Sequence, residues 1–219
     1  MDIMKNNMYD MGFIHEQVKK VLSKTKINDD SVDKGKLERE LVQYYADKFE
    51  SFTPEHFQVD FIDLFCGAGG LSVGLEQEGF CPIIAVDKDS SALLTYQFNR
   101  PWMAEENLIH DDIRELVGRD IFPHVPVIVG GPPCQGFSVV NKHDERNALY
   151  KFYVHAVNQS KPKIFLMENV EGILKLYEEI REDFGNIGYT VCDPLILSPK
   201  DFGFPQSRKR VFILGINND

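Results

Sequence analysis

The spacing of hydrophobic residues changes near residue 58. Before it, apolar positions recur at helical spacing, and they are Ile14, Val18, Val21, Leu22, Leu37, Leu41, Tyr44, Tyr45, Phe49 and Phe52. A polar stretch, TKINDDSVD, divides them into two groups and ends in Asp33, a suitable N-cap. The pattern predicts two helices in a helical N-terminal extension, residues 1–57, which packs as a cap on the main domain or on a partner.

From residue 58 onward, short apolar runs alternate with helical patterns. Strands are predicted at 59–65, 81–87, 107–110, 125–130 and 163–169, with a final pair at 189–198 and 210–216. Helices are predicted at 71–78, 88–98, 148–160 and 173–184. This alternation is typical of the α/β class with a doubly wound, mostly parallel sheet. We therefore expect one such domain over residues 58–219, with the last two strands antiparallel at one edge.

Composition excludes some classes of protein and raises one difficulty. Hydrophobic residues make up 43% of the chain and charged residues 26%, as in ordinary globular proteins. Neither an 18-residue apolar run nor a signal peptide is present, so we expect no membrane and a cytoplasmic location. The four cysteines lack CxxC or zinc spacing, which predicts reduced thiols and no metal site. The net charge of −10 is unusual for a protein that binds nucleic acid.

Glycines and acids gather where the first three predicted strands end. Ligands of such sheets bind at the carboxyl ends of the strands, beside the point where the strand order reverses. The first strand leads into DLFCGAGGLS, whose Gly67, Gly69 and Gly70 let the backbone approach a ligand. Asp87 ends the second strand and suits ribose hydroxyls, while Asp112 follows the third and suits an adenine amino group. Either acid alone is more often a helix cap. Together they predict a site for an adenosine-containing ligand, without saying which one.

A displayed thiol follows the fourth predicted strand. The sequence GGPPCQGFS holds Cys134 after Pro132 and Pro133, which restrict the backbone and exclude a helix. A cysteine that only packs would sit inside the apolar run, whereas this one follows it. The position favours a nucleophile at the same edge as the glycine turn.

Two further groups are predicted at that edge. Glu168 and Asn169 end the fifth strand, where a carboxylate beside a thiol suits an acid that protonates an electrophile. PQSRKR precedes the last strand, and its alternation puts Gln206, Arg208 and Arg210 on one face, able to hold an anion or a carbonyl oxygen. An ordinary strand end and a solvated basic strand are the alternatives.

The chain thus carries four motifs in this order: DLFCGAGGLS, GGPPCQGFS, Glu168 with Asn169, and the QxRxR motif within PQSRKR. Together they resemble the cytosine-C5 DNA methyltransferase family in its bacterial restriction-modification form. The resemblance covers roughly residues 59–216. It implies a class I, Rossmann-like methyltransferase fold, S-adenosylmethionine as the cofactor and S-adenosylhomocysteine as its product. It also implies double-stranded DNA as the partner, and a bacterial or phage-encoded protein that is nucleoid-associated in use.

The resemblance also assigns roles to residues. A thiolate at the Cys134 position adds to C6 of a flipped-out cytosine, Glu168 contacts N3 and the exocyclic amine, and Arg210 contacts the base, with Arg208 beside it. The expected cofactor contacts are Asp63, Phe65, Gly67, Gly69, Gly70, Asp87, Lys88, Asp112, Ile113, Pro132 and Leu149. Supporting positions in the substrate loop and around it are Pro133, Gln135, Ser138, Asn169 and Gln206.

The sequence departs from the family pattern after the QxRxR motif, where a target-recognition region and two further motifs are expected. Residues 60–219 carry 15 Lys and Arg against 23 Asp and Glu, a net charge of −8. We therefore predict that this is the cofactor-binding, catalytic subunit of a split enzyme. A complementary subunit would supply target recognition.

Four alternatives remain. A truncated remnant would bind cofactor without transferring methyl, and an RNA cytosine-C5 methyltransferase would share the chemistry. A non-enzymatic nucleotide-binding module is disfavoured because Cys134, Glu168 and Arg210 are all present. A NAD-dependent oxidoreductase is disfavoured because Ser72 occupies the third glycine position of GxGxxG.

Overall fold

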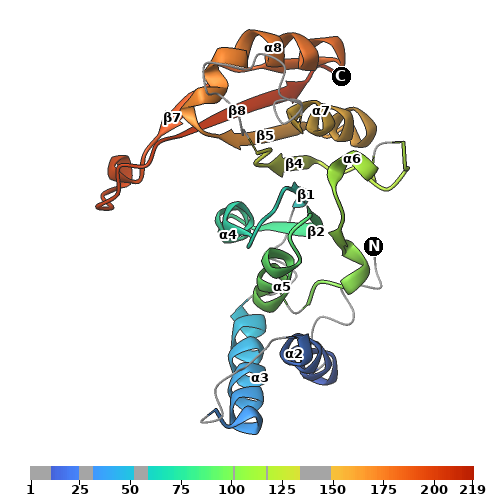
Figure 1. Ribbon diagram of the computed structural model, residues 1–219, viewed down its shortest axis with the longest axis vertical. Helices are drawn as coiled ribbons and strands as arrows, with labels where there is room; N and C mark the ends of the chain where they lie inside the picture. Colours follow the sequence, from blue (N-terminus) through green and yellow to red (C-terminus); the bar gives the residue numbers. More distant parts are fainter. Residues whose placement is uncertain (1–10, 25–31, 52–58, 101, 117, 134–148) are drawn as a thin grey trace.

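The computed structural model has three layers, a central sheet with helices on both faces (Figure 1). It describes residues 11–24, 32–51, 59–100, 102–116, 118–133 and 149–219. Helices α4 (Gly70–Gln77) and α5 (Ser90–Asn99) cover one face of the sheet, and α7 (Leu149–Ser160) and α8 (Tyr177–Asn186) cover the other. The short helix α6 (Ile113–Leu116) packs beside α7. The predicted α/β class is confirmed.

The sheet has eight strands in the order β3-β2-β1-β4-β5-β8-β6, with β7 also paired to β8. Its strands are β1 (Val59–Leu64), β2 (Phe80–Asp87), β3 (Leu108–His110), β4 (Val127–Gly130), β5 (Ile164–Asn169), β6 (Tyr189–Val191), β7 (Leu195–Leu197) and β8 (Arg210–Asn217). The first five are parallel, while β8 runs antiparallel to β5. The strand order reverses between β1 and β4, which makes this the switch point of the sheet.

Alternation along β1 divides the core between the two faces of the sheet. Ile62 and Leu64 belong to the large apolar cluster on the α7 and α8 side. Phe61 packs on the opposite face with Leu71 and Leu75 of α4. Asp63 also faces α4, because its carboxylate accepts a hydrogen bond from Ser72 of that helix. A carboxylate is thereby carried into the interior directly beneath the glycine turn.

Two segments differ from the sequence expectation. The helix expected at 173–184 begins as a 3-10 turn, η4 (Glu171–Leu176), before it continues as α8. The strand expected at 189–198 is interrupted, since β6 and β7 pair separately with the two halves of β8. Pro194 lies in this break and has no N–H to donate to β8.

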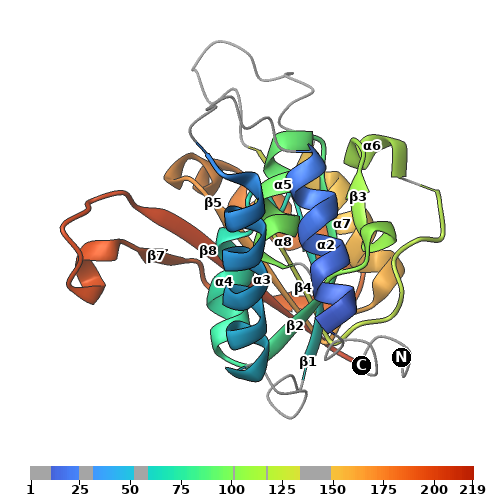
Figure 2. The ribbon, with the colours of Figure 1, turned by 90° about the horizontal axis from the view of Figure 1, so that it is seen from below.

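The N-terminal part contains the two predicted helices, α2 (Met11–Lys24) and α3 (Lys34–Ser51), which lie over α5 (Figure 2). Asp33 caps α3, since its carboxylate accepts the N–H groups of Gly35 and Lys36 at 2.9 and 3.0 Å. Val18 and Tyr45 form a small cluster whose flanking residues include Cys81 and Trp102. The two helices therefore pack on the β2 side of the sheet.

One predicted apolar position of α3 is not buried, because the side chain of Tyr44 is 55% exposed. Tyr45, the next residue, is buried and meets the Phe98 ring edge-on at 6.0 Å. Only one of two consecutive residues can face the neighbouring helix.

Within the described ranges, no helix combines the length and apolar composition needed to cross a bilayer.

Beyond the body of the sheet, β7 and the start of β8 form a projecting arm with η5 (Pro199–Phe202) at its end (Figures 1 and 2). We use "the arm" for residues 195–212. A capping box fixes η5. The Ser198 hydroxyl accepts backbone N–H of the first turn, and the Asp201 carboxylate accepts the backbone N–H of Ser198. The arm starts at the same sheet edge as the glycine turn.

Candidate active site

The switch point brings the predicted motifs to one edge of the sheet. Leu64 at the end of β1 lies opposite Gly130 at the end of β4. Gly130 in turn lies opposite Met167, which precedes Glu168 on β5. Glu168 pairs with Phe212 near the start of β8. The glycine turn, the entrance to the Cys134 loop, the acid and the basic segment therefore meet at this edge.

A cavity of about 380 Å³ lies at this edge. It is lined by Asp63, Phe65, Cys66, Gly70, Leu71, Gly131, Glu168 and Phe212. The lining joins residues of the glycine turn to Glu168, the predicted acid. Gly131 permits this approach, since a Cβ there would lie 3.2 Å from Oε2 of Glu168.

The backbone of the glycine turn leaves space for a ligand. Phe65, Gly67 and Gly69 all have positive φ, at 57°, 53° and 89°. A Cβ added at Gly67 or Gly70 would have no atom within 4 Å. The open side of the turn and the N-terminus of α4 thus present backbone to the cavity, as an adenosine-containing cofactor requires.

Asp87 organises the turn as well as ending β2. One carboxylate oxygen accepts the N–H of Gly67 at 2.8 Å, and the other accepts the N–H of Asp89 at 2.9 Å. A carboxylate has about four lone-pair sites, so acceptor capacity remains for ribose hydroxyls. Lys88 beside it is exposed, and its carbonyl oxygen lies 3.1 Å from Nε2 of His110.

Asp112 follows β3 and is already paired. Arg114 donates to both of its oxygens, at 2.9 and 2.7 Å, and its N–H adds a third bond at 3.0 Å. The hydrogen bond from Arg114 lowers the pKa of Asp112 to about 2. An adenine amino group would share this carboxylate with Arg114. Ile113 is buried in the core next to it.

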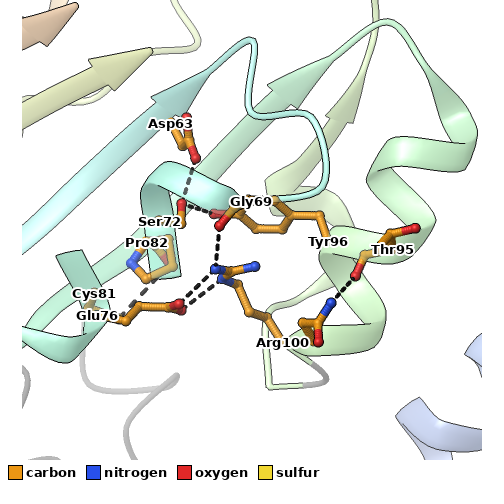
Figure 3. Close-up of polar contacts among 10 residues, drawn as sticks. Asp63, Gly69, Ser72, Glu76, Cys81, Pro82, Thr95, Tyr96 and Arg100 are labelled. Carbon is orange, nitrogen blue, oxygen red and sulfur yellow. Dashed lines mark hydrogen bonds and ion pairs between the residues drawn. The ribbon is translucent and has the colours of Figure 1, made fainter. Parts of the chain in front are cut away.

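Asp63 lines the cavity but directs its carboxylate beneath the turn (Figure 3). It is 1% exposed and accepts a hydrogen bond from the Ser72 hydroxyl at 2.5 Å. The oxygen of that Ser72 hydroxyl also lies 2.7 Å from the Tyr96 hydroxyl. Burial raises the pKa of Asp63 to about 7. The residue therefore supports the turn from inside the protein.

Glu168 and Arg210 form an ion pair at the opposite side of the cavity. Arg210 Nε lies 2.6 Å from Oε1 of Glu168. Burial raises the pKa of Glu168, and the positive charge of Arg208 opposes that rise. A carboxyl group held this way can exchange a proton at milder pH than an ordinary glutamate.

Asn169 fixes the backbone that leads to the predicted nucleophile. Its Nδ2 donates to the carbonyl of Pro132 at 2.9 Å, and its Oδ1 accepts the N–H of Val170 at 2.9 Å. Pro132 is buried and Pro133 half-buried. Cys134, Gln135 and Ser138 lie outside the described residues, so their roles stay predictions. Leu149 begins α7 and packs against the main core.

The arm carries a second hollow, of about 370 Å³. Its lining is Leu197, Ser198, Pro199, Phe202, Phe204, Gln206, Arg208, Arg210 and Phe212. Phe212 borders both hollows. Gln206, Arg208 and Arg210 share this lining, although β8 begins only at Arg210. Phe202 and Phe204 are 65% and 64% exposed, an apolar surface that the sequence did not single out.

Four polar residues near the turn were also missed: Ser72, Glu76, Tyr96 and Arg100 are all buried. The sequence reading treated Ser72 only as a departure from the glycine pattern. Arg100 follows the end of α5 and lies 24 positions from Glu76 on α4, so no local pattern joins them.

Comparison with known proteins shows several relatives. A type II methyltransferase, M.DdeI of Desulfomicrobium norvegicum, is 42% identical over 175 residues, covering 74% of this chain and 41% of that protein. M.BspRI of Lysinibacillus sphaericus is 33% identical over 245 residues, covering 93% of this chain and 54% of the relative. The chain thus spans about half or less of the length of these relatives.

Solved structures agree with the fold. A chain described as a DNA modification methyltransferase encoded within an Escherichia coli prophage has a TM-score of 0.63 at 36% identity. The alignment covers 73% of this chain and 47% of that one. The Dnmt2 methyltransferase of S. pombe has the same fold, with a TM-score of 0.57 at 23% identity and coverage of 74% and 50%.

A family model matches the whole α/β part of the chain. The model of the C-5 cytosine-specific DNA methylases matches residues 59–219, which include the glycine turn, the entrance to the Cys134 loop, Glu168 and the arm. The chain belongs to the C-5 cytosine-specific DNA methylase family.

Proposed function

We propose that this chain is the cofactor-binding and catalytic part of an enzyme that transfers a methyl group from S-adenosylmethionine to C5 of cytosine in DNA. The observation that carries the proposal is the single cavity lined both by the glycine turn and by Glu168. Family membership supplies the reaction class. The cavity supports its assignment to these residues.

The residues at the turn fit the cofactor. S-adenosylmethionine supplies an electrophilic methyl group. Gly67 and Gly70 leave open space for it beside the N-terminus of α4, and Asp87 offers remaining lone pairs to the ribose. Asp112 and Ile113 would border the adenine, and Phe65 lines the cavity. Lys88 and Leu149 complete the expected set with less support, because one is exposed and the other packs on the core.

Cys134 is the proposed nucleophile. Its thiolate would form a bond to C6 of the cytosine, and the electron pair of the C5–C6 double bond would form the bond from C5 to the methyl group, as the bond between that methyl and the sulfonium sulfur breaks and S-adenosylhomocysteine leaves. After transfer, C5 loses its proton to a base, the electrons restore the double bond, and the C6–S bond breaks to release the thiolate. The ring edge is inaccessible within a stacked duplex, so the base must leave the stack.

Glu168 is the proposed acid at N3. Addition of sulfur pushes negative charge into the ring, and a proton from Glu168 compensates it. Burial raises its pKa, which favours the protonated carboxyl that this role requires. Arg210 orients the carboxyl through the 2.6 Å ion pair, and Arg208 adds positive charge beside it.

We assign target recognition to a complementary polypeptide. The acidic charge of residues 60–219 is poorly suited to holding a duplex unaided. The arm instead combines four cations and one carboxylate with two exposed phenylalanines, next to the cavity. A partner that covers the arm would complete the surface that faces DNA.

The test is transfer of labelled methyl from S-adenosylmethionine to mixed-sequence DNA. We expect activity when the chain is combined with a lysate of its native host, and none when Cys134→Ser replaces it. Cofactor binding should survive that substitution. Activity of the chain alone would remove the need for a partner. Absence of transfer in both reactions, with cofactor still bound, would indicate a remnant.

A further inference from the structure

The rear of the glycine turn rests on a buried arginine. Arg100 follows the last residue of α5, is 1% exposed, and is among the largest fully buried side chains of the described residues. Its Nε and Nη2 donate to the two carboxylate oxygens of Glu76, both at 2.7 Å. Nη2 also donates to the carbonyl of Gly69 at 3.2 Å. Figure 3 shows these bonds converging below the turn.

Close packing accompanies these bonds. The guanidinium carbon lies 4.0 Å from the centre of the Tyr96 ring, whose hydroxyl meets Ser72. A Cβ added at Gly69 would lie 2.4 Å from Nη1 of Arg100 and 2.8 Å from Tyr96. The turn therefore has two different sides. Gly67 and Gly70 face open space, while Gly69 is pressed against Arg100 and Tyr96.

Stability alone does not account for this arrangement. Removing an arginine and a carboxylate from water is costly, and replacing a buried ion pair by apolar residues of similar volume is often neutral or stabilising. A planar guanidinium does provide something that apolar residues cannot. Its fixed fork grips both oxygens of Glu76 on α4 and leaves an N–H for the backbone of the turn.

We propose that Arg100 is a positioning residue for cofactor binding, which fixes the carbonyl of Gly69 so that the backbone of the turn faces the ligand. The inference rests on the proposed cofactor site and adds to it a residue that does not touch the cavity. Glu76 anchors the guanidinium to α4, and Tyr96 supports its face. Arg100 thus fixes the backbone of the glycine turn from the side opposite the ligand.

The experiment measures affinity for S-adenosylhomocysteine by calorimetry, at a temperature where each free protein is folded by circular dichroism. The main variant is Arg100→Met with Glu76→Leu, which removes both charges and leaves neither one buried alone. We expect affinity to fall at least tenfold in the folded protein. The matched control is Arg181→Gln with Glu178→Gln, an exposed pair at 3.0 Å on α8, with affinity within twofold of the unmodified chain.

Arg100→Lys keeps the proposal testable where the double variant does not fold. A lysine keeps the charge next to Glu76 but cannot reproduce the fork that also reaches Gly69. We expect three- to tenfold weaker binding together with a preserved circular dichroism spectrum.

The two levels of the proposal fail differently. Binding at unmodified affinity by a folded Arg100 variant would overturn the positioning role while leaving the cofactor site intact. Absence of binding by the unmodified chain would overturn the cofactor site and the positioning role together. A purely structural arginine would lower the unfolding temperature without changing the affinity of the folded fraction.

Discussion

The two sides of the cavity handle charge in opposite ways. On the side of the glycine turn, Asp63 and Arg100 are each 1% exposed, and each is hydrogen-bonded to a buried neighbour. On the other side, the side chains of Glu168 and Arg210 are 29% and 20% exposed, and Arg208 is exposed. The glycine turn is therefore held by buried groups. In the proposed mechanism, the more exposed acid and its arginines would rearrange when a base enters.

This difference separates two kinds of sensitivity to substitution. A change among the buried groups should affect stability and cofactor affinity, because the shape of the turn depends on them. A change among the half-exposed groups should affect the rate of transfer while leaving the fold and the cofactor site in place.

The largest effect is expected at the acid. Glu168→Gln removes the proton donor while keeping its size, so methyl transfer should slow by about 10²- to 10⁴-fold. Affinity for S-adenosylhomocysteine should stay within twofold. Rates come from labelled transfer with the complementing lysate, and affinity from calorimetry. Retained transfer would show that another group protonates the base.

The pH profile examines the same acid. Transfer should decline as pH rises through the raised pKa of Glu168, because the proton is then lost. Arg208→Gln removes the charge that opposes this rise, so the decline should move to higher pH. A decline at an unchanged pH would show that Arg208 does not affect the pKa of Glu168.

The buried side should show its effect in stability. The folded-state pKa of Asp63 is raised to about 7, above the unfolded value near 3.9, so the native state binds more protons. This contribution is fully present below pH 4 and is lost as pH rises through 7. It amounts to at most about 4 kcal/mol, from about three pKa units at 1.36 kcal/mol each.

Asp63→Asn provides the comparison, since it cannot ionise. Its stability relative to the unmodified chain should increase between pH 4 and pH 8 in urea unfolding at a series of pH values. A constant difference across that range would mean that Asp63 titrates alike in both states.

An intermediate effect is expected where β2 ends. Asp87→Ala leaves the N–H of Gly67 without its acceptor and removes the proposed ribose contact, so cofactor binding should weaken by about 1–3 kcal/mol. Asp89→Ala, two positions on, is the control. It removes the cap of α5 at about 1 kcal/mol of stability and should leave affinity unchanged. Equal affinities for the two variants would argue against Asp87.

The smallest effect on the folded chain is expected at the arm. Phe202→Ser and Phe204→Ser replace exposed rings, so the free energy of unfolding should change by no more than about 0.5 kcal/mol. Transfer with the complementing lysate should nevertheless fall. Unchanged transfer would show that the proposed partner does not depend on the exposed rings of the arm.

Much of the fold could be predicted because its signals are local. Apolar runs marked β1, β2, β4 and β5, and Asp33 marked the start of α3. The break between β6 and β7 contains Pro194, and the 3-10 turn η4 precedes α8 where one continuous helix was predicted. Neither has a periodic signal of its own.

The site was predictable in position and only partly in partners. Strand ends placed Asp87, Glu168 and the glycine turn at one edge, because parallel strands share that edge. The pairing of Arg100 with Glu76 depends on the packing of α4 against α5, which the sequence pattern does not contain. The salt bridge of Asp112 with Arg114 spans two residues and could have been anticipated.

The most direct test of the account identifies the labelled product. DNA and RNA would each be incubated with the chain, the complementing lysate and labelled S-adenosylmethionine, and the recovered nucleic acid digested to nucleosides. All label that depends on Cys134 should appear in 5-methylcytosine from DNA. Label in another methylated base, label confined to RNA, or equal label with Cys134→Ser would contradict it.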